Sequence, residues 1–267
     1  MKIGAQDRRS SAISTSNAET ILVRGRDLCA ELIGKISFTD HVWLLVTGDL
    51  PSPSQRRVLD ATLDAIAEHG LVPSVQAGRL TLAAAPEALQ GAVAAGVLGC
   101  GSVILGSAEA AGRLFDDVLR RSPGDLESGA RAVLGELVAA RRAIPGYGHP
   151  LHKGYDPRSR RLLEIATEAC LAGRHIEVAG VIEGLLPEMT GKSLAMNVSG
   201  AIPAVLLDAG YPLLALKGAP ILARTASLIA HLLEEQQRPI GFVLSHAAAA
   251  AIEYDGRAPD GFVRSDQ

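Results

Sequence analysis

The chain has 267 residues, of which 48% are hydrophobic and 21% are charged, so it can bury a sizeable core and is not a disordered protein. Its net charge of −3 creates no field that would attract nucleic acid or an anionic membrane surface. Aromatic residues make up only 3%, so alanine, leucine, valine and isoleucine must form the core. This composition favours closely packed helices over a β-sandwich.

In chain order, the first predicted helix begins at Asp27 and runs through Ile33. Residues 37–40, Ser-Phe-Thr-Asp, are typical of a second helix start. Residues 48–53 predict a turn, and Ser54 then opens a helix with one apolar stripe.

Residues 88–108 carry no charge, a length that also fits a membrane span. The segment is rich in alanine and glycine, so it gains little from lipid but lets helix backbones approach closely. We therefore expect a buried helix that other helices cross and that ends between Gly99 and Gly101.

The second half of the chain predicts a further series of helices, and strand-type alternation is scarce throughout. Asp156-Pro157 is a good N-cap and first-residue pair for one of them. The expected ranges are 125–142, 157–169, 176–185, 202–209, 220–236 and 239–252. The sequence thus predicts an all-α fold.

Three widely spaced cysteines, Cys29, Cys100 and Cys170, show no metal-type pairing. We expect reduced, buried thiols, no metal site and a cytoplasmic protein. The polar start of the chain lacks the apolar core of a signal peptide.

The most informative stretch is residues 145–153, Pro-Gly-Tyr-Gly-His-Pro-Leu-His-Lys, followed by Asp-Pro-Arg at 156–158. Two glycines around Tyr147 make a loop whose backbone can approach a flat or anionic ligand. His149 adds a side chain that exchanges protons near neutral pH. Arg158 can bind a carboxylate through two hydrogen bonds. A bare Gly-x-Gly also fits an ordinary turn between helices.

The complete run resembles the Pro-Gly-(Tyr/Phe)-Gly-His…Asp-Pro-Arg signature of citrate synthases and citryl-CoA lyases, and the length suits the short citryl-CoA lyase branch. Other segments that resemble this superfamily are Arg24-Gly25, Ser37-Phe38, the turn from Gly48 to Pro51, residues 197–200, Arg224, Arg238-Pro239 and residues 254–256.

The resemblance implies a large helical domain formed by both chain ends, residues 1–107 and 206–267, with a smaller helical domain, residues 108–205, inserted between them. It also implies a homodimer or higher homo-oligomer. Coenzyme A would bind as a thioester substrate at the loop of Gly146, Tyr147 and Gly148. No cofactor would be bound permanently, and neither nucleic acid nor membrane would be a partner.

The resemblance further assigns roles to individual side chains. His149 would contact the substrate's carbonyl or hydroxyl oxygen, while Arg158 and Arg224 would hold carboxylates. Arg238 would reach into the partner subunit's site. His231, seven residues after Arg224 on the same helix face, is a further substrate-binding candidate, although a histidine on a helix is more often structural.

The sequence departs from the citrate synthase pattern at three places. Ser199 replaces the aspartate of the family's Asn-Val-Asp segment. Residues 101–106 lack the histidine expected in a Gly-x-x-His-Gly motif. Residues 68–70, Glu-His-Gly, match the family, but Ala77 stands where a later histidine is expected.

These losses affect the two reaction directions differently. Condensation needs a base for a weakly acidic α-proton, which a serine hydroxyl cannot supply unaided. Cleavage of citryl-CoA needs a base for the tertiary hydroxyl and a hydrogen-bond donor for the departing enolate. His149 and Ser199 could fill those roles, although both directions share a transition state. Ser199 could instead be a helix N-cap.

Three functions follow as hypotheses. The favoured one is cleavage of citryl-CoA, or a related 3-hydroxyacyl-CoA, to acetyl-CoA and oxaloacetate. A citrate synthase-type acyltransferase would lack its enolising pair. A non-catalytic homologue that binds coenzyme A would explain the same losses.

Overall fold

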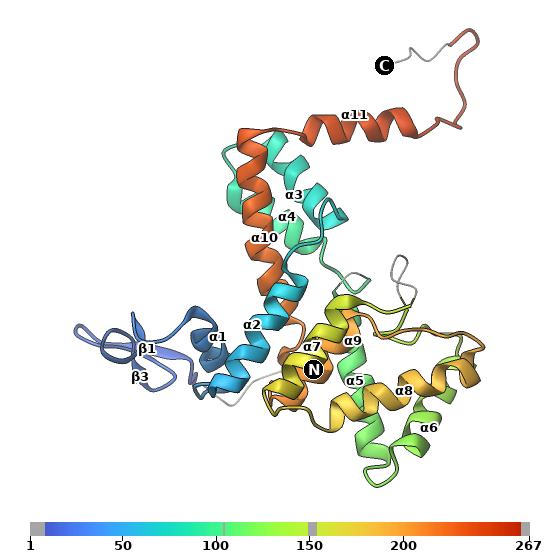
Figure 1. Cartoon of the computed structure of the whole chain (residues 1–267). Helices are drawn as coiled ribbons and strands as arrows, with labels where there is room; N and C mark the ends of the chain where they lie inside the picture. The colour runs from blue at the N-terminus through green and yellow to red at the C-terminus, as the bar shows by residue number, and fades with distance from the viewer. Residues whose placement is uncertain (1–8, 104, 149–153, 263–267) are drawn as a thin grey trace. The chain divides into compact units, whose positions relative to one another are not determined.

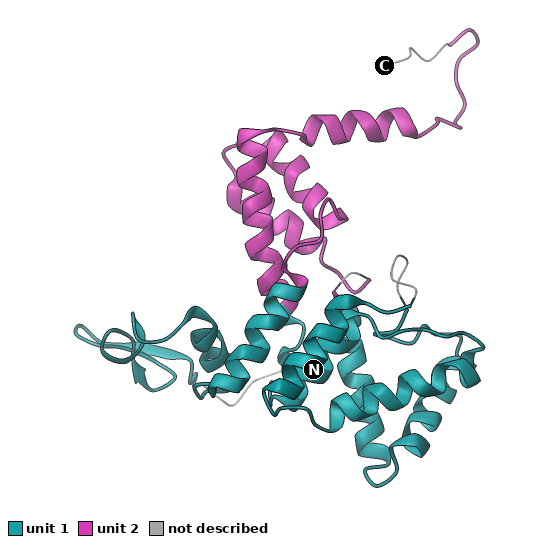
Figure 2. Cartoon of the chain, in the orientation of Figure 1, with its two compact units in different colours: residues 1–65, 107–219 teal, residues 66–106, 220–267 magenta. Residues whose placement is uncertain are grey.

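The computed structural model describes residues 9–103, 105–148 and 154–262, and the chain is mostly helical over these ranges (Figure 1). The predicted all-α class is therefore confirmed. The chain divides into two compact units (Figure 2). Unit 1 contains residues 1–65 and 107–219, and unit 2 contains residues 66–106 and 220–267.

One border between the units, at residues 106 and 107, lies next to the predicted domain border at 107 and 108. The units otherwise group residues by their contacts in a different way from the predicted large and small domains. The division into domains 1–107, 108–205 and 206–267 stays a prediction.

A small antiparallel sheet begins the described part of unit 1. Strands β1 (Ser14–Ser16), β2 (Ile21–Val23) and β3 (Arg26–Asp27) pair in the order β1-β2-β3. The left-handed residues Arg24 and Gly25, with φ of 52° and 79°, form the turn between β2 and β3. Strands of two or three residues are too short for a detectable alternation, which is why the sequence did not predict them.

Capping side chains set the helix starts that the sequence predicted near the N-terminus. Asp27 accepts hydrogen bonds from the amides of Cys29 and Ala30 and begins the short helix η1 (Leu28–Leu32). Ser37 and Asp40 cap α1 (Phe38–Thr47) reciprocally, and α2 covers Pro53–Ala67. Leu44, fully buried, lies in the local core of this region.

The remaining helices of unit 1 form its main core. They are α5 (Gly106–Arg121), α6 (Leu126–Ala139), α7 (Pro157–Glu168), α8 (Arg174–Thr190) and α9 (Val198–Asp208), followed by the single turn η2 (Leu213–Ala215). Helix α6 packs on α8, and both α7 and α8 pack on α9. The sequence placed most of these helices within a few residues but named no helix over α5.

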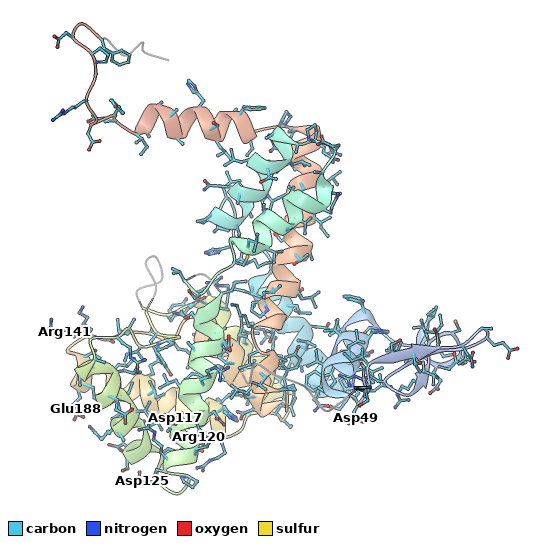
Figure 3. The ribbon with its side chains drawn as sticks, turned by 180° about the vertical axis from the view of Figure 1, so that it is seen from behind. Asp49, Asp117, Arg120, Asp125, Arg141 and Glu188 are labelled. Atoms are coloured by element: carbon cyan, nitrogen blue, oxygen red, sulfur yellow. The ribbon has the colours of Figure 1, made fainter. Side chains whose placement is uncertain are left out.

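Surface charges of unit 1 are mostly paired with one another. Arg120 lies beside Asp117 on α5, with 3.2 Å between its Nη2 and Oδ1, and Asp125 caps the next helix (Figure 3). Glu188 on α8 binds Arg131 of α6 at 2.6 Å. Such exposed pairs contribute little stability and indicate no ligand site.

Unit 2 is built from α3 (Pro73–Ala84), α4 (Leu89–Leu98), most of α10 (Gly218–Gln237) and α11 (Gly241–Ala251). Its apolar core consists of Leu82, Ala92, Leu228 and Leu232. A Cβ atom on Gly96 would lie only 2.3 Å from Leu228 Cδ2, so the Leu228 side chain of α10 packs directly on the backbone of α4. A helix within residues 88–108 is confirmed, since α4 ends at Leu98 and its C-cap is Gly99. Only Ala92 and Gly96 on it are buried and Leu98 is exposed, so the expected burial holds for one face of the helix.

The three cysteines differ in their exposure. Cys100 is buried, but Cys29 and Cys170 are exposed, so the expectation of three buried thiols is wrong for two of them.

The stretch Leu213–Gln237 is long and apolar enough to cross a membrane by length and composition alone. That is weak evidence, because core helices pass the same test, and α10 packs on its own unit through Leu228 and Leu232.

Candidate active site

The predicted coenzyme A loop lies against residues 195–200 in unit 1. Gly146 and Gly148 have φ of 87° and 79°, in the left-handed region that favours glycine. The amide of Gly148 donates to the Ala195 carbonyl at 2.8 Å, and that of Asn197 donates to the Gly146 carbonyl at 2.9 Å. Backbone hydrogen bonds therefore fix the loop and the start of α9 to each other.

The contact between these segments leaves no room for side chains. A Cβ atom on Gly146 would lie 2.7 Å from Gly200 Cα, and one on Gly200 would lie 2.5 Å from the Gly146 oxygen. Both distances are too short for any real Cβ contact. The loop can therefore approach α9 only because both positions are glycine, and this brings Ser199 beside it.

Tyr147 turns away from the surface of the loop. Its ring is 7% exposed, packs edge-on against Phe115 and donates its hydroxyl to the Ala179 carbonyl at 2.7 Å. Burial and the nearby Glu183 raise the pKa of the phenol well above its usual value. The predicted coenzyme A contact of Tyr147 is thus limited to its backbone groups, because the side chain anchors the loop in the core.

Asn197 forms the junction between the loop and α9. Its Oδ1 accepts a hydrogen bond from the Ser199 amide at 2.9 Å, which makes Asn197 the N-cap, and its Nδ2 donates to the Gly148 carbonyl at 2.7 Å. The interpretation of Ser199 as an N-cap is therefore wrong. Ser199 is the second residue of the helix, half-buried, at the positive end of the helix dipole.

Asp156 and Arg158 form a two-bond ion pair at the start of α7. Arg158 Nε lies 3.1 Å from Asp156 Oδ1, and Nη2 lies 2.9 Å from Oδ2. Burial alone would raise the pKa of Asp156, which is 2% exposed, but hydrogen bonds from Arg158 and Val198 outweigh it and lower the pKa. Asp156 is therefore ionised at neutral pH and cannot serve there as an acid.

The same carboxylate links α7 to α9. Asp156 Oδ2 accepts the Val198 amide at 3.0 Å, so one buried side chain holds Arg158 and the residue before Ser199. The sequence predicted Asp156 only as a helix cap. The long-range bond has no local signal, because it depends on how α7 packs on α9.

A pocket of about 600 Å³ adjoins this site within unit 1. It shares Asp156, Ala195 and Met196 with the segments that hold the loop, and Glu164, Glu168 and Glu183 also line it. Glu164 pairs with Arg160, which also lines the pocket, and Glu168 pairs with Arg161, so the lining carries charges of both signs.

The structure places the other predicted substrate residues on or beside α10 in unit 2. Arg224 is 7% exposed, whereas the Arg238 side chain is 79% exposed and binds Glu234. Both ring nitrogens of His231 have protein partners: Nε2 lies 3.0 Å from Glu68 Oε2 and Nδ1 lies 3.2 Å from Arg79 Nη2. Direct substrate binding by His231 would require displacing one of these partners.

His149 lies outside the described residues, so its catalytic role stays a prediction. Loop residues Gly146 to Gly148, Arg158 and Ser199 come together in unit 1, while Arg224, His231 and Arg238 belong to unit 2. In the part of the chain that the structure describes, no group of histidine, cysteine and carboxylate side chains could hold a metal ion.

A model of the citrate synthase C-terminal domain family matches residues 51–241, more than half of the chain. This protein belongs to the citrate synthase family. The citryl-CoA lyase of Hydrogenobacter thermophilus has a similar structure, with a TM-score of 0.84 and 30% sequence identity over 95% of this chain and 97% of that one.

More distant relatives share the fold. The ATP citrate lyase of Methanothrix soehngenii, solved with citrate and coenzyme A, gives a TM-score of 0.77 at 23% identity, over 96% of this chain and 43% of that one. The citrate synthase of Thermoplasma acidophilum is 26% identical over 181 residues, or 59% of this chain and 45% of that protein. The chain spans about half the length of the curated relatives it matches.

Proposed function

We propose that this protein is a citryl-CoA lyase-type enzyme, which cleaves citryl-CoA or a related 3-hydroxyacyl-CoA to acetyl-CoA and oxaloacetate. The observation that carries the proposal is the contact of the Gly146–Gly148 loop with the start of α9, where Ser199 stands beside the loop. Similarity to the Hydrogenobacter citryl-CoA lyase over nearly the full length of both chains supports it.

The chemistry divides between two side chains. His149 would remove the proton of the tertiary hydroxyl, and the new carbonyl would form as the adjacent carbon–carbon bond breaks. The electron pair would move into the thioester enolate, which Ser199 would stabilise by donating a hydrogen bond at the positive end of α9. Protonation of the enolate carbon would complete acetyl-CoA.

Substrate binding would use backbone and side-chain groups together. The coenzyme A thioester is a substrate, not a permanently bound cofactor, and meets the backbone of residues 146–148. The pocket beside Ala195 and Met196 would receive part of the coenzyme A chain. Arg158 would bind a carboxylate of the acyl group while Asp156 keeps its guanidinium in place.

The active protein would be a cytoplasmic homodimer formed through unit 2. Helix α11 contains no charged residue, and Phe242 and Val243 on it are 72% and 63% exposed. Ile229 and Leu233 on α10 are also more than half exposed. Apolar helix faces of this kind are usually covered in the assembled protein. Light scattering measures the mass of the purified protein in solution and so tests whether it is a dimer.

A paired assay tests the proposed function. Purified protein is given citryl-CoA in one reaction, and acetyl-CoA with oxaloacetate in the other. We expect cleavage in the first and little net condensation in the second, since a lyase does not hydrolyse citryl-CoA and so has no step that draws condensation forward. Net condensation without cleavage would instead identify an acyltransferase.

A second candidate function is a non-catalytic homologue that binds coenzyme A. The serine at position 199 favours it, because the family's carboxylate is absent there while the loop is intact. Coenzyme A affinity measured by calorimetry, with no turnover of citryl-CoA by wild type, would support this function. If turnover is present, His149→Ala should lower it by about 10²–10⁴-fold.

A further inference from the structure

A line of polar side chains crosses the otherwise apolar helices of unit 2. It starts at Glu68, the residue directly after α2. The Glu68 carboxylate accepts hydrogen bonds from the Ser227 hydroxyl, the Gly70 amide and His231 Nε2. Burial alone would raise the pKa of Glu68, but these hydrogen bonds lower it to about 2. The same hydrogen bonds from Ser227 and His231 tie the turn of residues 68–70 to α10.

The second member is His231, whose tautomer its neighbours determine. Arg79 can only donate hydrogen bonds, so His231 Nδ1, 3.2 Å from Arg79 Nη2, must accept. The ring proton then lies on Nε2 and points to Glu68 at 3.0 Å. Both ring nitrogens are therefore in use within the protein.

The third and fourth members are Arg79 and Glu235. Their side chains are 1% and 2% exposed, and Arg79 Nη1 lies 3.1 Å from Glu235 Oε2. Glu235 also accepts the amides of Ile240 and Gly241, which lie at the start of α11. We name Glu68, His231, Arg79 and Glu235 the polar chain. It runs from the 68–70 turn through α3 and α10 to α11.

From this arrangement we infer that Glu68 and His231 are positioning residues and that His231 does not itself bind substrate. Together they hold the turn that carries His69 against one face of α10, and Arg224 lies on that face. Ser227 and His231 follow Arg224 by three and seven residues, so all three share one helix face. The inference rests on the proposed function and takes Arg224 as the carboxylate contact that the resemblance to citrate synthases implies.

Direct contact and positioning predict different results. If His231 binds substrate, Glu68→Ala frees the imidazole, and citrate affinity stays the same or rises. If both residues only position the turn, Glu68→Ala and His231→Leu disturb the same structure. Each should then weaken citrate binding by about 10- to 100-fold, and the double variant should be no worse than either single one.

A conservative variant and a control complete the calorimetric experiment. His231→Gln should retain most of the affinity, because its amide can donate to Glu68 and accept from Arg79. Glu87→Ala removes an exposed glutamate of the same unit and should change nothing. Unchanged or tighter citrate binding by Glu68→Ala, or fully additive losses in the double variant, would overturn the inference.

Two spectroscopic readouts do not depend on the proposed function. Nitrogen-15 spectra of wild type should show a neutral His231 protonated at Nε2, and Glu68→Ala should speed hydrogen exchange of the Gly70 amide. An Nδ1-protonated or charged His231, or unchanged Gly70 exchange, would refute the polar chain. If wild type neither binds citrate nor cleaves citryl-CoA, the proposed function fails, and these two readouts alone decide the structural inference.

Discussion

The loop site of unit 1 and the polar chain of unit 2 hold their functional residues in opposite ways. In unit 1 backbone contacts hold the loop, since Gly146 and Gly200 meet without side chains between them and the Gly148 amide donates to the Ala195 carbonyl. In unit 2 the side chains of Glu68, His231 and Arg79 do it. The loop site should therefore be sensitive to added atoms, and the polar chain to lost hydrogen-bonding groups.

Ser199 should show the largest effect in unit 1, as the side chain expected to meet the enolate there. Ser199→Ala should reduce citryl-CoA cleavage by about 10²–10³-fold, because the enolate loses a hydrogen-bond donor. Since Asn197 caps α9, the melting temperature should stay near that of wild type. Ser193→Ala, at an exposed serine of the preceding segment, is the control.

Deuterium exchange into acetyl-CoA is a second measurement of the role of Ser199. Wild type should exchange the methyl protons of acetyl-CoA with solvent deuterium very slowly, because a serine is no base near neutral pH. Ser199→Asp should speed that exchange. Rapid exchange in wild type would mean that another residue supplies the base.

Gly200→Ala tests the backbone contact itself. The new methyl group would lie 2.5 Å from the Gly146 oxygen, so the loop must move. We expect about a 100-fold loss of activity and roughly 1–3 kcal/mol of lost stability, measured by kinetics and thermal unfolding. Gly180→Ala, in open space on α8, should instead stabilise by about 0.5–1 kcal/mol. Equal behaviour of the two variants would remove the basis of the comparison.

Arg158 should show a smaller effect on activity, through substrate binding, and its removal should also cost stability because the buried Asp156 loses its ion-pair partner. Arg158→Ala should cost about 1.5–3 kcal/mol in the binding of a tricarboxylate, because a charge-assisted pair of hydrogen bonds is lost. Arg158→Lys should recover only part of it, since an ammonium lacks the planar fork. Arg160→Ala, exposed on the same helix, should bind citrate like wild type. If citrate raises the melting temperature of Arg158→Ala as much as that of wild type, Arg158 is not a carboxylate contact.

Asp156→Asn should have the smallest effect on chemistry and act on stability. The pKa of Asp156 is lower in the folded state than the unfolded value of about 3.9, so its contribution is complete above that pH and is lost as the pH falls through the folded pKa. We expect Asp156→Asn to be less stable by roughly 1–3 kcal/mol at pH 7. The gap in unfolding free energy should close below about pH 4. A gap independent of pH would exclude the ion pair as its source.

Much of the fold was predictable because its signals are local. Ser37 with Asp40, Asp156 with Pro157, and Asp27 each mark a helix start that the structure has at that place. The alanine- and glycine-rich stretch predicted a closely packed helix ending between Gly99 and Gly101, and α4 ends at Leu98 with Gly99 as its C-cap. The sequence did not predict the short strands, because two or three residues are too few to show an alternation of apolar and polar side chains. It also did not predict α5, because no helix start was assigned there.

For the candidate site, the sequence by itself determined which residue types were present: two glycines around Tyr147, an Asp-Pro-Arg cap and a serine in place of an aspartate. Only the tertiary structure decided how they act. It turned Tyr147 into the core, gave the N-cap to Asn197 and made Asp156 a bridge to Val198. It also used both nitrogens of His231 within unit 2. A cap or a turn depends on neighbours within about four residues. The contacts of Tyr147 with Ala179, Asp156 with Val198 and His231 with Glu68 join residues 32 to 163 positions apart, so only the packing of the helices could bring them together.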